Sequence, residues 1–85
     1  MNAIAWQVKA LRQLRKVPPQ SATEIRAAVS TELTDMTTAR NVKALMNHEY
    51  SYRLRVGNYR VFFEFDGAVR IVKIEEVRKR NEHTY

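Results

Sequence analysis

The stretch of sequence that decides the fold lies in the C-terminal half of the chain. It reads Tyr52-Arg53-Leu54-Arg55-Val56-Gly57-Asn58-Tyr59-Arg60-Val61-Phe62-Phe63-Glu64-Phe65. At its start, Tyr52, Leu54 and Val56 alternate with arginines, and this period of two residues is typical of a strand with one buried face. Such a strand buries its apolar side chains and exposes guanidinium groups on its other face.

The Gly57-Asn58 pair predicts that the chain reverses direction after this strand. Glycine and asparagine are among the few residues that accept positive φ in the tight turns between antiparallel strands. The returning strand, at residues 59–65, then brings Arg60 beside Arg53 and Arg55. The sequence therefore predicts a cationic surface built on a β-hairpin.

Aromatic side chains on the face opposite the arginines form the candidate core of this hairpin, because alternate residues of a strand point to opposite faces. The residues expected there are Tyr52, Tyr59, Phe63 and Phe65. Phe62 has the same parity as Arg60, so we expect it to be half exposed among the arginines.

A short strand and a basic helix are predicted at the N-terminus. Residues 4–7 alternate between apolar and small or polar side chains, and Val8, Leu11 and Leu14 then fall at helical spacing. Pro18-Pro19 ends this helix, because proline cannot donate a backbone hydrogen bond and restricts the residue before it.

A second helix follows the prolines. Ser21-Ala22-Thr23-Glu24 matches a capping box, and apolar residues between Ile25 and Leu33 form one stripe of a helix. Residues 34–49 are predicted as a loop that contains a turn of helix or a segment covering the core. After the hairpin, Asp66-Gly67 indicates another tight turn, followed by a last strand at Val69–Val77 and a polar tail that leaves the sheet from Arg78.

The fold class that follows is α+β, in a single domain over residues 1–85. The element order is β-α-α-β-β-β, with a helix hairpin packed on one face of a small, mostly antiparallel sheet. A chain of 85 residues leaves room for only a small core.

Positive charge dominates the composition, with 15 Lys and Arg against 9 Asp and Glu and a net charge of +6. This balance suits a polyanionic partner such as nucleic acid, a ribosome, an acidic membrane surface or an acidic protein, and does not choose among them. Besides the hairpin arginines, a second basic cluster is formed by Arg78-Lys79-Arg80, with Glu75, Glu76 and Glu82 on its flanks.

Several kinds of site are disfavoured by what the sequence lacks. It contains no cysteine, which excludes disulfides and cysteine zinc sites, and its two histidines are far apart. We therefore expect no metal and no cofactor, and we expect His48 to be a surface or capping residue. No signal-peptide core and no apolar run of roughly 18 residues is present, so we expect a cytoplasmic protein that does not enter the membrane.

Taken together, these features resemble the RelE/ParE superfamily, the small basic toxins of bacterial type II toxin–antitoxin pairs. The resemblance covers nearly the whole chain: the opening strand, Ala10-Leu11-Arg12-Gln13-Leu14 in the first helix, the hairpin at residues 52–61 and a tail that ends in Tyr85. It implies a RelE-like fold. The hairpin motif also occurs in members that do not cleave RNA, so it identifies the superfamily better than the activity.

For the RelE branch, the resemblance implies an endoribonuclease that cleaves mRNA in the ribosomal A site without a metal, by attack of a ribose 2′-hydroxyl on the adjacent phosphate. This chemistry needs a base for the hydroxyl, positive charge for the phosphorane oxygens and an acid for the departing 5′-oxygen. The implied partners are mRNA on the ribosome and a cognate antitoxin, with which the toxin can form a higher-order complex that binds operator DNA.

The resemblance also implies which residues form the site. The catalytic candidates are Arg60, Arg80, His83 and Tyr85, and the candidates for RNA or phosphate binding are Arg53, Arg55, Arg78 and Lys79. An alignment made backwards from the terminal tyrosine places Lys79 instead of Arg80 at the late catalytic cation.

One difference from RelE itself concerns the basic pair on the first hairpin strand. RelE carries lysines there, whereas this chain carries Arg53 and Arg55, which keep their protons at physiological pH and are poor bases. Proton transfer would then come from His83 and Tyr85, since histidine is the side chain whose unperturbed pKa lies near neutrality.

Two other functions fit the same residues. One is a ParE-like DNA gyrase inhibitor without catalytic activity, and the other is a simple RNA- or DNA-binding module, whose affinity falls steeply with salt and which releases no product. Taken alone, alternating arginines are more often a solvated sheet face, and the basic tail could serve solubility or dock an acidic antitoxin segment.

Overall fold

A five-stranded sheet and two helices make up the part of the chain that the computed structural model describes, residues 1–80. In chain order the elements are β1 (Ala3–Trp6), α1 (Val8–Arg15), α2 (Pro19–Glu32), β2 (Val42–Ala44), β3 (Tyr52–Val56), β4 (Tyr59–Asp66) and β5 (Ile71–Lys79). The strand order is β1-β5-β4-β3-β2, with β1 parallel to β5 and the other neighbours antiparallel. The predicted α+β fold is confirmed.

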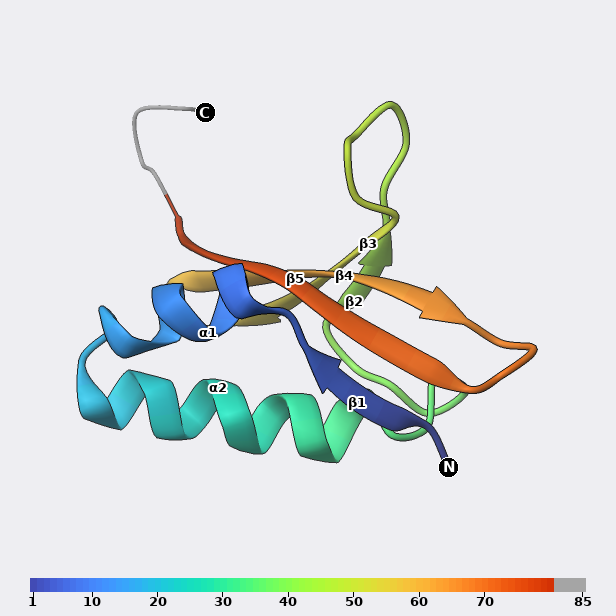
Figure 1. Ribbon diagram of the computed structural model, residues 1–85, viewed down its shortest axis with the longest axis horizontal. Helices are drawn as coiled ribbons and strands as arrows, with labels where there is room; N and C mark the ends of the chain where they lie inside the picture. Colours follow the sequence, from blue (N-terminus) through green and yellow to red (C-terminus); the bar gives the residue numbers. More distant parts are fainter. Residues whose placement is uncertain (81–85) are drawn as a thin grey trace.

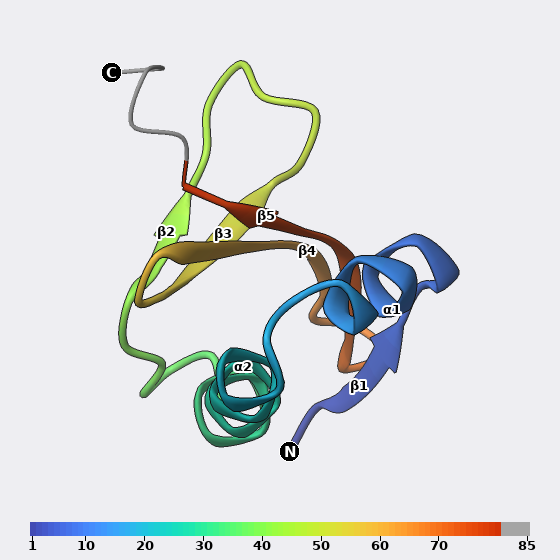
Figure 2. The same cartoon turned by 90° about the vertical axis from the view of Figure 1, so that its left-hand side faces the viewer.

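The two helices lie on one side of the sheet, as Figure 1 shows. The loop at residues 45–51, in yellow-green, rises on the other side, and the turned view in Figure 2 shows the same arrangement. We call the face of the sheet turned away from the helices the open face. Within residues 1–80, neither helix is long and apolar enough to cross a membrane.

The core fills the space between the helices and the covered face of the sheet. Leu54 on β3 and Val61 on β4 face each other in the register, and both are fully buried. The helical layer packs against the sheet through Leu14, Ile25, Val29 and Leu33. Burying each such side chain stabilises the fold by about 1.5–3 kcal/mol. Because Leu54 and Val61 point to the helices, Arg53 and Arg55 point to the open face, as predicted.

All the aromatic residues of the hairpin follow the predicted parity, but one is more buried than expected. Phe63 is fully buried, and Tyr52, Tyr59 and Phe65 are partly buried and pack against the core. Phe62 was expected to be half exposed on the arginine side, but only 9% of its surface is exposed. Neighbouring side chains on the open face cover it, as described below.

The segment predicted as loop or helical turn contains a short strand instead. β2 pairs with β3 so that Val42 lies opposite Leu54 and Lys43 lies opposite Arg53. The strand spans Val42–Ala44, which is too short for an alternating pattern to be visible in the sequence. Its pairing with the strongly patterned β3 stabilises it.

The second helix starts earlier than the capping box predicts. α2 begins at Pro19, with Pro18 as its N-cap and no side-chain cap hydrogen bond. The Thr23 hydroxyl donates to the carbonyl oxygen of Pro19 at 3.0 Å, one turn back. Proline at the first helical position has a suitable φ and loses no hydrogen bond there, so the proline pair both separates the helices and starts the second one.

The last strand lies two residues later than predicted. Asp66 Oδ1 accepts hydrogen bonds from the backbone N–H groups of Ala68 (3.0 Å) and Val69 (3.4 Å), and this extended turn delays β5 to Ile71. The strand then continues to Lys79, so the prediction that the tail leaves the sheet from Arg78 is wrong.

A β-bulge changes which residues of β5 face the core. The pairing of β4 with β5 shifts at the Phe62–Phe63 step and leaves Glu75 as an extra residue on β5. As a result Ile74 and Val77 are both buried in the core, although residues three apart in a regular strand point to opposite faces. Glu76, which lies opposite Phe62, is turned to the open face with only 4% of its surface exposed.

Candidate nucleic-acid interface

Basic side chains gather on the open face because the strand register sets them opposite one another. Lys43 pairs with Arg53, Arg55 pairs with Arg60, and Arg60 pairs on its other side with Arg78. Directly opposed residues of antiparallel strands share a face, and like charges in that arrangement destabilise a sheet. The register therefore concentrates positive charge on the open face.

A hollow of about 360 Å³ opens on this face. It is lined by Lys43, Leu45, His48, Arg53, Arg60, Phe62 and Arg80. The Arg60 guanidinium donates hydrogen bonds to the carbonyl oxygens of Gly57 (3.2 Å) and Tyr59 (3.0 Å). The backbone N–H of Arg80 donates to the carbonyl oxygen of Asn58 at 2.6 Å, so the end of β5 meets the same turn. Cations beside an aromatic side chain are the combination that binds single-stranded nucleic acid.

An aromatic cluster covers Phe62. The His48 ring stacks on Phe62 with centroids 5.1 Å apart and planes 15° apart, and the Tyr50 ring lies tilted at 5.7 Å. The Arg78 guanidinium carbon lies 5.2 Å from the Phe62 centroid, within the range of a cation–π contact. The loop before β3 and the strand β5 thus meet over one phenylalanine of β4.

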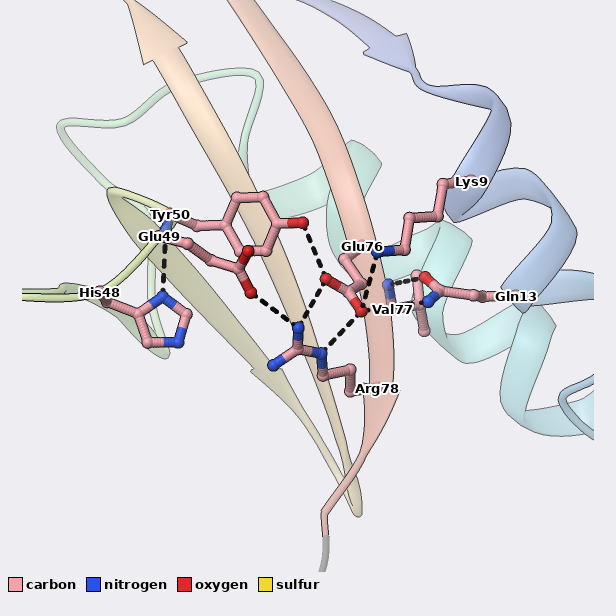
Figure 3. A network of polar contacts seen from close by, with 8 residues as sticks. All are labelled: Lys9, Gln13, His48, Glu49, Tyr50, Glu76, Val77 and Arg78. Carbon is pink, nitrogen blue, oxygen red and sulfur yellow. Dashed lines mark hydrogen bonds and ion pairs between the residues drawn. The ribbon is translucent and has the colours of Figure 1, made fainter.

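Glu76 is the centre of a polar network beside this cluster, shown in Figure 3. Its carboxylate accepts hydrogen bonds from Arg78 Nε (2.7 Å) and Nη2 (2.8 Å), and from the Tyr50 hydroxyl at 2.8 Å. Arg78 Nη2 also donates to Glu49 at 2.9 Å. A guanidinium that binds a carboxylate through two N–H groups forms one of the stronger polar contacts in proteins.

The same carboxylate is bound from the opposite side by α1. Gln13 Nε2 donates to Glu76 at 3.3 Å, and Lys9 Nζ lies 3.6 Å from the same oxygen. Gln13 Oε1 accepts the backbone N–H of Val77 at 2.6 Å. β1 pairs with β5 only as far as Ile74, so Gln13 satisfies a backbone donor that the sheet leaves unpaired.

The network shifts the pKa values of its members. Burial raises the pKa of Glu76, but hydrogen bonds from Arg78, Tyr50 and Gln13 outweigh it and lower the pKa to about 2. The hydrogen bond to Glu76 raises the pKa of the Tyr50 hydroxyl to about 12, and the same carboxylate raises the pKa of Arg78. Across the physiological range Glu76 is therefore an anion and Tyr50 a hydrogen-bond donor.

His48 is held by its own loop. The backbone N–H of Tyr50 donates to His48 Nδ1 at 3.0 Å. A neutral imidazole whose Nδ1 accepts a hydrogen bond carries its proton on Nε2. The side chain thus lines the hollow with a ring face and one N–H donor.

Comparison with known proteins identifies the family. Residues 4–83 match the sequence model of a family described as the ParE toxin of the type II toxin–antitoxin system, parDE. The chain belongs to this family. It is a type II toxin of the RelE/ParE superfamily, as the sequence indicates. The sequence has no significant match among curated proteins.

Solved structures of RelE toxins share the fold. The toxin–antitoxin complex RelBE2 from Mycobacterium tuberculosis matches with a TM-score of 0.74 and 23% identity, covering 93% of this chain and 98% of the other. The intact RelBE complex from E. coli matches with a TM-score of 0.74 and 18% identity, covering 96% of this chain and 100% of the other. The archaeal RelE–RelB complex from Pyrococcus horikoshii matches with a TM-score of 0.70 and 20% identity, covering 95% of this chain and 97% of the other. At these identities the likeness shows the fold.

The structure brings only some of the toxin's predicted site residues together. Arg53, Arg60 and Arg80 come together at the hollow. Arg55 lies opposite Arg60 on the same face, next to the hollow rather than among its lining residues. Lys79 pairs with Tyr59 and therefore has the opposite orientation to Arg78 on β5.

Arg78 has an environment that the sequence did not predict. Arg78 was predicted to bind RNA phosphate, and within the protein its guanidinium contacts Glu76, Glu49 and the Phe62 ring. The candidates His83 and Tyr85 lie outside the described residues. Within residues 1–80, no group of three histidine, cysteine, aspartate or glutamate side chains is placed to hold a metal ion.

Sequence reasoning missed His48, Tyr50 and Glu76 as parts of the site. His48 is exposed as expected, but it also lines the hollow. Tyr50 and Glu76 meet only because the bulge on β5 turns Glu76 to the open face. A buried glutamate two residues before an arginine on a strand is a weak signal, and nothing in the sequence pairs it with a tyrosine 26 residues away.

Proposed function

We propose that this toxin is an endoribonuclease that cleaves mRNA in the ribosomal A site, without a metal, by attack of a ribose 2′-hydroxyl on the adjacent phosphate. The observation that supports this most is the hollow, where Lys43, Arg53, Arg60 and Arg80 surround His48 and Phe62. Cations fixed around a cavity stabilise the extra negative charge of a phosphorane, and aromatic rings beside them suit a nucleobase.

In this proposal the reaction forms a bond from the 2′-oxygen to phosphorus and breaks the bond from phosphorus to the 5′-oxygen. Arg60 and Arg80 act on the phosphate oxygens, with Arg60 oriented by its bonds to the turn carbonyls. Arg53 and Arg55 bind the RNA phosphates along β3, and Arg78 extends this basic surface on β5. Lys79 has the opposite orientation, so in this proposal it is not part of the surface on the open face. His83 and Tyr85 exchange protons with the two oxygens, a role that rests on the resemblance to the superfamily.

The proposed partner that silences the toxin is a cognate antitoxin. The related RelE structures were solved as complexes with antitoxins, and a protein that binds the open face here would block access to the hollow. We also propose that the pair forms a higher-order complex on operator DNA. The ribosomal target places the toxin in the cytoplasm.

A second candidate function is inhibition of DNA gyrase without catalysis. It is favoured by the family itself, which is described by the ParE toxin, and by the arginines at positions 53 and 55, which are poor bases. A nucleic-acid-binding module without either activity is the third candidate.

Primer extension on an mRNA held in purified translating ribosomes tests the proposal. The wild-type toxin should produce new 5′ ends at the decoding site, whereas Arg60→Ala and His83→Ala should reduce them by about 100-fold, the range for losing one charge-stabilising or proton-transferring group. A reaction without ribosomes shows whether the ribosome is needed.

Arg26→Ala is the matched control, because Arg26 is an exposed cation on α2, on the far side of the sheet. It should cleave like the wild type. A folded toxin that produces no new ends and instead blocks supercoiling by purified gyrase would overturn the nuclease proposal in favour of the second candidate.

A further inference from the structure

The loop at residues 45–51 carries His48 and is attached to the sheet at several points. At its base, Leu45 N–H donates to the Ser51 carbonyl oxygen at 2.8 Å, and Ser51 N–H donates to Glu64 at 2.8 Å. Farther up the loop, the Tyr50 hydroxyl donates to Glu76 at 2.8 Å. His48, an exposed residue of this loop, is then placed by its bond from Tyr50 and its stack on Phe62.

Tyr50 links His48 to strand β5 of the sheet. Its hydroxyl is bound to β5 through Glu76, and its backbone N–H is bound to the imidazole. Its ring also contacts the same phenylalanine on which His48 stacks. A change at Glu76 therefore reaches His48 through one residue, without touching the hollow.

A glutamate is an unusual residue at a position as buried as that of Glu76. Removing a carboxylate from water costs several kcal/mol, and apolar replacements of buried ion pairs are often neutral or stabilising. Here the carboxylate gathers groups from three elements: Tyr50 from the loop, Arg78 from β5, and Gln13 with Lys9 from α1. These contacts are more specific in geometry than an apolar side chain could provide.

We propose that Glu76 is a positioning residue for the RNA site: through Tyr50 and Arg78 it holds the 45–51 loop over Phe62, so that His48 presents its Nε2–H to the RNA as a hydrogen-bond donor. This inference rests on the proposed nuclease function. The acceptor is an oxygen of the phosphate or an acceptor atom of the adjacent base. His48 thus donates a hydrogen bond to the RNA while its ring stacks on Phe62, and it is not the general base.

Cleavage by variants of the network tests the positioning role. In single-turnover reactions on ribosome-bound mRNA, Glu76→Gln keeps the size of the side chain but removes the ion pair with Arg78. Tyr50→Phe keeps the ring but removes the hydroxyl. Each should lower the cleavage rate by about 10-fold or more, as misplacement of a reacting group does, with a smaller effect on RNA binding. Glu75→Gln removes the same charge one residue away and should cleave like the wild type.

Substitutions of His48 test which ring nitrogen matters. The side-chain amide of glutamine can replace an Nε2–H donor, whereas the shorter asparagine reaches only the position of Nδ1. His48→Gln should therefore retain more cleavage than His48→Asn. Equal loss in both variants, or a greater loss with glutamine, would contradict the donor role.

A measurement that does not depend on cleavage separates the two proposals. In the free toxin, side-chain ¹H–¹⁵N correlations should show neutral His48 protonated on Nε2, and ring-current shifts from Phe62 should mark the stack. Tyr50→Phe and Glu76→Gln should reduce both signatures, while Glu75→Gln should not.

The outcomes then separate cleanly. If the wild type cleaves and the network variants cleave equally well with unchanged His48 signals, the positioning role is wrong and the nuclease proposal stands. If the wild type does not cleave at all, the nuclease proposal fails, and with it the role of His48 toward RNA, whatever the His48 signals show.

Discussion

The arginines of the open face differ in how closely carboxylates of the protein itself approach them. Arg78 contacts two carboxylates, and one of them, Glu76, is almost fully buried. Arg53 shares its face with Lys43 and lies at the hollow. The charge of Arg78 is therefore largely matched within the protein, while that of Arg53 is directed at whatever fills the hollow. The sequence alone makes these arginines look equivalent.

Glu76 also makes the stability of the toxin depend on pH at the acid end. Its pKa in the folded protein is about 2, below the ordinary value of 4.5. A lowered folded-state pKa means that the stabilisation is fully present above pH 4.5 and is lost as the pH falls from 4.5 towards 2. Urea unfolding between neutral and acid pH should show the wild type losing stability more steeply than Glu76→Gln.

Every other carboxylate is common to the two proteins, so the difference between their curves isolates Glu76. At neutral pH the variant should already be less stable by about 2 kcal/mol, the scale of hydrogen bonds to a charged group. Parallel curves throughout the acid range would mean that Glu76 is not bound in the way described here.

At the scale of elements, the β3–β4 hairpin organises the molecule. It carries core residues on one face and the arginines on the other, and its turn touches both Arg60 and the end of β5. The turn depends on a single backbone conformation, because Gly57 has φ of +55°. Residues with a side chain adopt this region at a cost of roughly 1–2 kcal/mol.

Replacing that glycine should therefore cost stability without a clash. Gly57→Ala introduces a Cβ that meets no atom within 4 Å, so any loss reports backbone strain alone. We expect a loss of about 1 kcal/mol in urea unfolding. Gly67→Ala is the control: its φ lies outside the positive range and its Cβ would make an ordinary contact of 3.5 Å with the Phe65 ring. If both variants lose the same stability, the strain explanation is wrong.

Elements with long, regular patterns could be predicted from the sequence, and elements that depend on their neighbours could not. The helices and the hairpin follow from periodicity and turn residues. β2 is formed by its pairing with β3, and the bulge on β5 lies opposite the Phe62–Phe63 step, where no glycine or proline in the sequence marks it. The site follows the same division. Arg53 and Arg60 could be predicted from the hairpin motif, and Arg80 from the resemblance to the superfamily, whereas His48 and Glu76 enter the site through the loop and the bulge.

At the scale of the whole molecule, the positive charges are divided between the helical side of the sheet and its open face. The net charge of +6 includes cations on the helical side as well as those of the open face. Net charge alone would attract RNA to any side of the protein, whereas the proposed function needs the phosphates at the hollow. Salt dependence separates these two contributions.

Binding of a single-stranded RNA that cannot be cleaved, with 2′-O-methyl groups throughout, should weaken linearly in a plot of log affinity against log salt. Each phosphate contact contributes about 0.7 to the slope for a single strand. Arg53→Ala should therefore lower the slope by about that amount, because it removes a cation at the hollow. Arg26→Ala changes the net charge equally from the far side of the sheet and should leave the slope unchanged. Equal changes in both variants would show that RNA is attracted by overall charge, and would remove the open face as the site of RNA binding.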